Sequence, residues 1–350
     1  MSVEKKFLKY VSYWTTSEDD KDCTPSTQRQ FDLAKALEEE LKELGLEKVK
    51  TDEHAYVYGL LPATEGMESA KAVGFIAHLD TAPDMTGENV KPQIIENYDG
   101  NDILLKGSGE YIRVSDFPTL TSLKGRKLIT TDGTTLLGAD DKAGIAAIMQ
   151  AVEEIKNENL PHGDIWVGFT PDEEVGSGAE LLDLDYFQAD FAYTVDGGYE
   201  GEISYENFNA ASADFTVKGV NVHPGEAKDI MVNAAAVACE IQSLLPESET
   251  PEHTEKREGF YHLTDISGNV GEAELSYIIR DHDKTIFENR KKRLKEIEAD
   301  MNQKYGEGTV TLTLKDSYRN MIEVLEKDMG IVDIAKESIK ECGMNPVSDA

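Results

Sequence analysis

One short stretch of the chain gathers carboxylates that would need a cation beside them. Residues 134–155 read TTLLGADDKAGIAAIMQAVEEI, so Asp140 and Asp141 follow an apolar approach and precede a helix rich in small residues. Two adjacent carboxylates at the start of a buried helix repel each other and lose hydration unless a cation neutralises them. The simpler interpretation, acids that stabilise a helix N-terminus, would be preferred if this stretch stood alone.

Three further apolar segments end in side chains that can bind metal. These residues are His78 and Asp80 in AVGFIAHLD, Glu173 and Glu174 in FTPDEEVGSGA, and Asp196 in FAYTVDGG. In open α/β sheets, ligands bind where the carboxyl ends of the strands meet. Zinc accepts imidazole nitrogen and carboxylate oxygen, and a carboxylate can bridge two ions. The pattern therefore predicts a site for divalent ions, each of which offsets repulsion among the acids.

Residue spacing indicates how two of these pairs could work. His78 and Asp80 are two residues apart, so in an extended chain they point to the same side and Asp80 can orient the imidazole. Glu173 and Glu174 are adjacent in a turn, so their side chains should diverge. One can then bind metal while the other takes a proton from water. The alternative for either pair is an ordinary surface pair in a strongly acidic chain.

The bulk composition limits the class of protein. The chain has 350 residues, 39% of them hydrophobic, which is enough for two domains with sizeable cores. A net charge of −33, from 68 acids and 35 bases, argues against nucleic acid and anionic membranes as partners. The three distant cysteines predict no disulfide framework, and no apolar run is long enough to span a bilayer. We therefore expect a cytoplasmic protein.

Strands and helices alternate along the first part of the chain. Periodic apolar residues predict helices over 3–15 and 24–46, and apolar runs predict strands over 54–63, 72–80, 164–171 and 191–198. This alternation predicts an α/β fold, a mostly parallel sheet with helices on both faces.

From about residue 208 the order changes to strand, helix, two strands, helix and strand. This β-α-β-β-α-β order is typical of a ferredoxin-like sandwich. We expect it to form a domain over 208–318, inserted into a first domain made of 1–207 and 319–350. The alternative is a continuation of the first sheet.

Taken together, the motifs resemble those of a known family, the dizinc M20 peptidases. The matching segments are GFIAHLDTAPDMTG, LLGADDKAGIAAIM, FTPDEEVGSGA and YTVDGG. The opening KKFLKYVSYWTTS, the helix TPSTQRQFDLAKALEEELKELGL and the strand YVYGLLPAT narrow the resemblance to members that release the N-terminal residue of tripeptides. The resemblance implies a zinc-peptidase catalytic domain with an inserted ferredoxin-like lid. The lid is the family's usual dimerisation surface, so a homodimer is expected.

The same resemblance implies a set of zinc ligands. His78 and Asp196 would bind one zinc ion, Glu174 would bind the other, and Asp140 would bridge both. In this family the bridging Asp commonly precedes a cis peptide bond, which here would join Asp140 and Asp141.

Catalytic and substrate-binding roles follow from the resemblance as well. Glu173 would be the general base and Asp80 the partner of the zinc-binding histidine. In the lid, His223 of NVHPGEAKD would help to stabilise the oxyanion, and Arg280 of YIIRDHD would bind the C-terminal carboxylate of the peptide. Either lid residue could instead be an ordinary exposed polar residue.

The chain departs from the family pattern at its C-terminal end. Family members continue through a Gly-Gly-Thr-Asp segment to a histidine that completes the second zinc site, whereas no histidine here follows His282. We expect two zinc ions per subunit in a complete chain, with the second site lacking its C-terminal histidine in this one. The alternative function is that of an inactive or impaired relic that keeps peptide binding or self-association through the lid.

Overall fold

A five-stranded sheet organises the first of two units into which the chain divides, Met1–Gly197. The computed structural model describes residues 1–348. In sheet order the strands are β1 (Glu47–Thr51), β2 (Val57–Leu61), β8 (Ile165–Thr170), β3 (Val73–His78) and β9 (Phe191–Thr194). Strands β8, β3 and β9 run parallel, whereas β1 and β2 are antiparallel to their neighbours.

The α/β class predicted from the sequence is confirmed, and the sheet is mixed rather than mostly parallel. Strand β1, with the sequence EKVKT, is a polar and partly exposed edge strand, so it carries no apolar run that would predict it. A tight turn joins it to β2, in which the Asp52 carboxylate accepts hydrogen bonds from the N–H groups of His54 and Tyr56. So short a connection can join only antiparallel strands.

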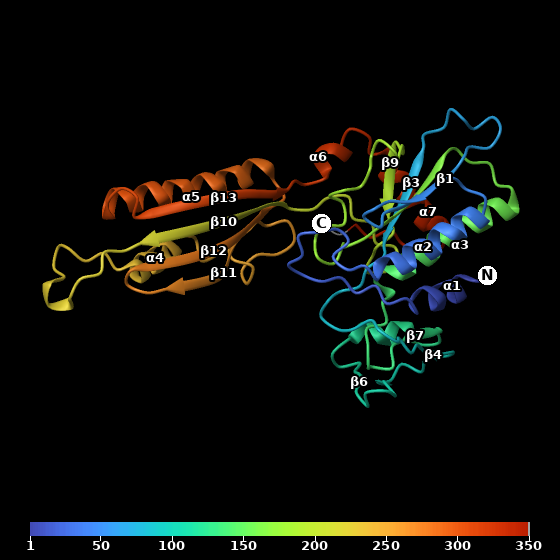
Figure 1. Cartoon of the computed structure of the whole chain (residues 1–350), viewed down its shortest axis with the longest axis horizontal. Helices are drawn as coiled ribbons and strands as arrows, with labels where there is room; N and C mark the ends of the chain where they lie inside the picture. Colours follow the sequence, from blue (N-terminus) through green and yellow to red (C-terminus); the bar gives the residue numbers. More distant parts are fainter. Residues whose placement is uncertain (349–350) are drawn as a thin grey trace. The chain divides into compact units, whose positions relative to one another are not determined.

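Both faces of the central strands are buried, and alternate residues serve different layers. On one face Val57, Leu61, Val167 and Phe169 pack against α1 (Val3–Tyr10), α2 (Gln30–Glu43) and α3 (Ala139–Glu158). On the other face Tyr58, Leu60 and Trp166 pack with Phe187 and Tyr186 from the segment before β9. Figure 1 shows α2 and α3 beside the sheet, with α1 next to α3. Because successive side chains point to opposite faces and both faces are buried, these strands are almost uniformly apolar.

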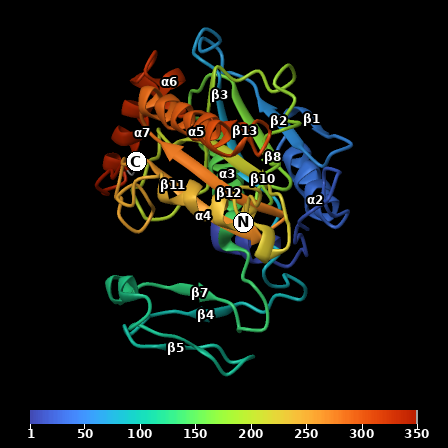
Figure 2. The same ribbon diagram turned by 90° about the vertical axis from the view of Figure 1, so that its left-hand side faces the viewer.

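An excursion between β3 and α3 forms two small hairpin-like sheets of its own. Strand β4 (Gln93–Ile95) pairs with β7 (Leu128–Thr130), and β5 (Ile103–Leu104) pairs with β6 (Tyr111–Ile112). A 3-10 helix, η1 (Pro118–Leu123), precedes β7. Figure 2 shows β4, β5 and β7 standing apart from the five-stranded sheet of the same unit.

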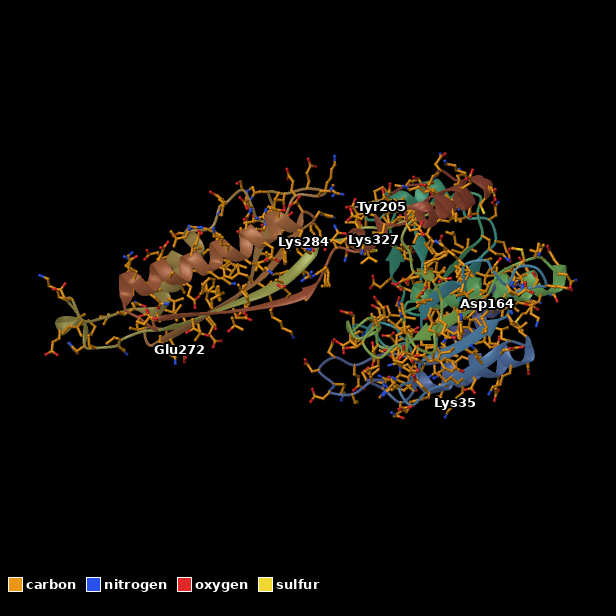
Figure 3. The ribbon with its side chains drawn as sticks, turned by 90° about the horizontal axis from the view of Figure 1, so that it is seen from above. Lys35, Asp164, Tyr205, Glu272, Lys284 and Lys327 are labelled. Carbon is orange, nitrogen blue, oxygen red and sulfur yellow. The ribbon has the colours of Figure 1, made fainter. Side chains whose placement is uncertain are left out.

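The second unit, from Gly198 onward, contains the predicted ferredoxin-like sandwich. Its elements are β10 (Asn209–Lys218), η2 (Pro224–Glu226), α4 (Ala234–Ser243), β11 (Phe260–Gly268), β12 (Glu272–Asp281), α5 (Lys284–Tyr305) and β13 (Val310–Tyr318). The sheet order is β11-β12-β10-β13 and every pair is antiparallel. In Figure 3, Glu272 marks the start of β12, and Lys284 marks the start of α5, just after the other end of that strand.

Two short helices, α6 (Ile322–Leu325) and α7 (Gly330–Glu341), follow the sandwich. Beyond them, Val347 donates its N–H to the carbonyl of Gly201 and accepts from the N–H of Ile203, at 2.8 Å each. The division at 197/198 therefore groups this C-terminal stretch with the second unit. The predicted assignment of 319–350 to the catalytic domain stays a prediction.

Two further features bear on the expectations from composition. Across residues 1–348, the structure contains no helix with both the length and the apolarity needed to cross a membrane. Cys23, Cys239 and Cys342 are free and exposed.

Candidate metal centre

The first unit brings together the metal-binding side chains expected at the strand ends. His78 ends β3, Glu173 and Glu174 follow β8, and Asp196 follows β9. Because these three strands are parallel neighbours, their carboxyl ends meet at one edge of the sheet. Asp140, in the first turn of α3, reaches the same edge.

His78 lies at the centre of the cluster, with each ring nitrogen facing a different side. Its side chain is only 2% exposed. Nε2 lies 2.9 Å from Oδ1 of Asp140, 3.8 Å from Oδ2 of Asp196 and 3.9 Å from Oε2 of Glu173. Nδ1 lies 3.3 Å from the carboxylate of Asp80 and 3.1 Å from its backbone carbonyl. Nε2 is therefore directed at the acids, where it could bind a metal ion.

Two overlapping groups of side chains could each hold an ion. In one, His78, Asp140 and Glu174 bring ligand atoms within 4.8 Å of one another, and in the other His78, Glu173 and Asp196 do so. The expected ligands all belong to one group or the other. Glu173, expected to be the base, approaches His78 as closely as Asp196 does, so proximity alone does not separate base from ligand.

Asp80 holds more than the histidine. Its fully buried carboxylate accepts a hydrogen bond from the N–H of Glu173 at 3.0 Å and from the N–H of Glu174 at 3.2 Å, in addition to facing His78. The sequence predicted only the contact with the histidine. Asp80 therefore fixes the strand end of β3 and the turn after β8 to one another.

The start of α3 is shaped so that Asp140 and Asp141 point in different directions. Gly138 has φ of +75°, and the peptide bond between Asp140 and Asp141 is cis, as the family resemblance implied. Buried Asp141 accepts hydrogen bonds from the N–H of His78 at 3.2 Å and of Gly144 at 3.1 Å. A Cβ on Gly144 would lie 2.0 Å from the carbonyl oxygen of Val195, so glycine lets α3 approach the end of β9.

Crowding shifts the acids of the cluster towards their neutral forms. Burial raises the pKa of Asp196 to about 6, and repulsion from Asp140 and Glu173 adds to the shift. Burial also raises the pKa of Glu174, again with repulsion from Asp140. For Asp141, burial is the main reason that its pKa is raised to about 8. Each of these carboxyl groups is held where its charge is costly.

His78 responds to the same field in the opposite sense. Burial lowers its pKa, but hydrogen bonding and attraction from Asp80, together with Asp140 and Asp141, raise the pKa to about 10. The imidazole ring of His78 is therefore favoured in its protonated form, which carries a positive charge among the acids.

The donor set fits a divalent metal. Zinc takes imidazole nitrogen and carboxylate oxygen, and its binding displaces protons from groups such as these. A histidine whose second nitrogen faces a carboxylate, as Nδ1 of His78 faces Asp80, is the usual arrangement for a metal-binding imidazole. The residues present therefore suit one or two such ions.

Comparison with characterised proteins identifies the family. Peptidase T of Clostridium perfringens (strain 13 / Type A) is 54% identical over 348 residues, which is 99% of this chain and 85% of that protein. The chain belongs to the peptidase T family. Peptidase T of Caldanaerobacter subterraneus subsp. tengcongensis is 53% identical over 346 residues, 98% of this chain and 84% of that protein.

Family models match parts of the chain as well. Residues 205–309 match a peptidase dimerisation domain of the M20 peptidases, and residues 117–236 match the M42 glutamyl aminopeptidase model. The first match covers the sandwich of the second unit except for its last strand, β13. As a member of the peptidase T family, the protein is a peptidase of the hydrolase class.

Solved structures share the fold. The aminopeptidase PepT from Bacillus cereus superposes with a TM-score of 0.77 at 22% identity, covering 99% of this chain and 83% of that one. YXEP from Bacillus subtilis, described as a dinuclear metal-binding peptidase of the M20 family, gives a TM-score of 0.60 at 12% identity, covering 99% and 82%. At these identities the likeness concerns the fold alone.

The two lid residues expected to bind substrate lie in the second unit. His223 is exposed, and its Nδ1 accepts a hydrogen bond from the N–H of Gly225 at 3.1 Å. The guanidinium of Arg280 donates to the carbonyl of Ile279 at 2.9 Å and lies 5.3 Å from the ring centroid of Tyr318. Neither residue belongs to the cluster of the first unit, and both roles stay predictions.

Two buried charged residues beside the cluster, Asp172 and Lys142, had no role in the predictions from sequence. Asp141, expected with Asp140 to need a cation, instead holds the backbone of His78, and Asp172 precedes the glutamate pair. Lys142 is buried, donates from Nζ to the carbonyl of Tyr13 at 2.8 Å, and has its pKa lowered to about 7 by burial. The sequence feature that could have indicated these residues is a charged residue directly next to a ligand motif, within an otherwise apolar stretch.

Proposed function

We propose that this protein is a zinc-dependent aminopeptidase that releases the N-terminal residue of tripeptides. The observation that carries the proposal is the convergence of His78 with Asp140, Glu173, Glu174 and Asp196 in a member of the peptidase T family. The dinuclear metal-binding peptidase that shares this fold supports the assignment of two ions.

In this proposal the ligands divide between two positions. His78 and Asp196 would hold one ion, Glu174 would hold the other, and Asp140 would contribute to both. The 2.9 Å separation of Asp140 from Nε2 of His78 supports its central place. When bound, such ions polarise a peptide carbonyl and acidify a water molecule.

Glu173 is assigned as the general base. Its side chain is 51% exposed, which leaves its carboxylate accessible to a substrate and to water. Asp80 holds the backbone N–H of Glu173, so the carboxylate is delivered from a fixed turn. Glu173 takes a proton from the attacking water and passes it to the leaving amine, while Asp80 keeps Nε2 of His78 directed at the acids.

The second unit supplies the remaining assignments. We assign His223 to the oxyanion and Arg280 to the C-terminal carboxylate of the peptide, as polar groups on the predicted lid. The match of residues 205–309 to a dimerisation domain supports a homodimer formed through this sandwich. Three free cysteines support residence in the reducing cytoplasm.

A panel of tripeptides with free and acetylated amino termini tests the substrate class. Zinc-supplemented protein should release the first residue of free tripeptides, and acetylation should abolish cleavage. The variant E173Q should be inactive, whereas E180Q, which alters an exposed acid of the same segment, should match the wild type. Cleavage of acetylated but not free tripeptides would contradict an aminopeptidase, and equal activity of E173Q would contradict the site.

A further inference from the structure

Asp172 stands directly before the glutamate pair and is almost completely buried. It is 1% exposed, and its backbone has φ of +53°, in the left-handed region that few residues other than glycine adopt. The residue closes the turn between β8 and Glu173, and its carbonyl accepts the N–H of Ser177 at 2.9 Å. No part of the proposed mechanism uses its carboxylate.

Both oxygens of that carboxylate accept hydrogen bonds from the N-terminal segment. Oδ2 accepts the N–H of Ser26, and Oδ1 accepts both Oγ of Ser26 and Nε2 of Gln30, at 2.6 Å each. In return, Oε1 of Gln30 accepts the N–H of Asp172 at 3.2 Å. All of these donors are neutral, so the interaction fixes a geometry rather than pairing two charges.

The other end of the same N-terminal segment is bound to the loop that follows Asp80. The N–H of Ser17 donates to the carbonyl of Thr81 at 3.1 Å, and the hydroxyls of Thr16 and Thr81 lie 3.1 Å apart. Cross-links join the two ends, because Thr27 and Arg29 both donate to the carbonyl of Thr16, at 2.9 and 2.7 Å. Residues 16–30 therefore form a strap between the two loops that carry the site.

We propose that Asp172 is a positioning residue that locks the Glu173–Glu174 turn to this strap, and thereby sets the distance of both glutamates from His78. The inference rests on the proposed function only in taking Glu174 as a metal ligand and Glu173 as the base. The strap is also bound at Thr81, just after the end of β3. It therefore connects the glutamate turn to the strand end that carries His78.

A reciprocal exchange isolates this contact. In D172N an amide replaces the carboxylate, so its –NH2 group meets either the N–H of Ser26, at the Oδ2 position, or Nε2 of Gln30, at the Oδ1 position, and one hydrogen bond is lost. Adding Q30E supplies an acceptor opposite the new amide and returns the missing charge, while Oε1 can still accept the N–H of residue 172. The matched control is D164N. The Asp164 carboxylate also accepts a backbone hydrogen bond, from the N–H of Ala63 at 2.8 Å. Asp164, labelled in Figure 3, lies directly before the start of β8, at the opposite end of that strand from Asp172.

Binding of Co2+, followed by its visible absorption, provides a readout that does not depend on turnover. D172N should weaken Co2+ binding by about tenfold or more, as removal of groups that orient ligands does. D172N/Q30E should recover most of the affinity, and D164N should resemble the wild type. S26A removes the hydroxyl that donates to Asp172 and accepts the N–H of Glu18. It should give a smaller loss than D172N, and it carries the test if D172N does not fold.

Tripeptide hydrolysis separates the two proposals. In an active protein, D172N should lower kcat with little change in KM, because substrate contacts remain while the base is displaced. Wild-type protein that binds Co2+ but cleaves no tripeptide would overturn the proposed function, and the Co2+ titrations would still decide the role of Asp172. Folded D172N and S26A that bind Co2+ as tightly as the wild type, or a D172N/Q30E variant without recovery, would overturn the inference.

Discussion

Adjacent residues at the centre of the site have different surroundings, which gives them different proposed tasks. Glu174 is partly buried, and burial raises its pKa, so a cation beside it would be favourable. The Glu173 side chain is half exposed and free to meet water. Both backbone N–H groups are held by Asp80, so the two carboxylates are displayed from one rigid turn.

This difference predicts opposite results for two conservative substitutions. Glu174→Gln should lower the metal content measured by elemental analysis, because a neutral amide oxygen replaces a charged ligand. Glu173→Gln should keep the metal and lose at least about 100-fold in rate, because no base remains to take the proton. Metal lost from the Glu173 variant but retained by the Glu174 variant would mean that the two roles are exchanged.

The residues of the site are predictable to the extent that their motifs are local. His78 with Asp80, and Glu173 with Glu174, occupy short motifs directly after apolar strands, so type and spacing indicate their chemistry. Asp172 resisted prediction because its partner Ser26 lies 146 residues away, and nothing local marks that contact. The hold of Asp80 on the glutamate turn, across 93 residues, was missed for the same reason.

At the scale of elements, strands with an apolar pattern were predictable and the polar edge strand was not. Strands β2, β3 and β8 are buried on both faces and read as continuous apolar runs. Strand β1 is polar, so its hairpin with β2, and with it the mixed character of the sheet, could not be read from the pattern. The sandwich was predictable because the apolar residues of β10 and β12 alternate and α5 is long.

One buried histidine of the sandwich should make stability depend on pH. His282 is 5% exposed, its ring lies 4.1 Å from that of Phe208, and within residues 1–348 neither ring nitrogen has a hydrogen-bond partner. Burial and Arg257 lower its pKa, although Glu206 and Asp281 oppose the shift. The unfolded chain therefore takes up a proton below about pH 6.5 that the folded one resists, so acid removes stability.

The substitution His282→Leu should consequently stabilise the protein, by about 1 kcal/mol near pH 8, because it removes unpaired buried nitrogens. The gain should be larger at pH 5.5, where the wild type also resists protonation. Urea unfolding at both pH values measures this, with His253→Gln as the control at an exposed histidine of the same unit. A gain that shrinks on acidification would contradict the assignment.

At the scale of the whole molecule, the family match and the sandwich point to assembly. Strands β11 and β13 form the two edges of the four-stranded sheet, and edge strands are ready to pair with another chain. Ile266 on β11 is 47% exposed. The sequence could predict this domain but not the surface that it presents, since exposure depends on how the strands are ordered in the sheet.

A symmetric dimer is the expected state in solution. Light scattering at micromolar concentration should give twice the 38.7 kDa mass of one chain. Ile266→Lys should shift the protein towards monomer, because a charge on an edge strand opposes pairing. Ile334→Lys, at an exposed position of α7, should leave the mass unchanged. A monomeric wild type would contradict assembly through the sandwich.

The central claim is that metal binds among His78, Asp140, Glu174 and Asp196. Crystals grown with zinc, with diffraction recorded just above and just below the zinc absorption edge, test it directly. The account predicts anomalous peaks about 2.0–2.2 Å from Nε2 of His78 and from the carboxylate oxygens of Asp140. Zinc bound elsewhere, with no peak at this cluster, would contradict it.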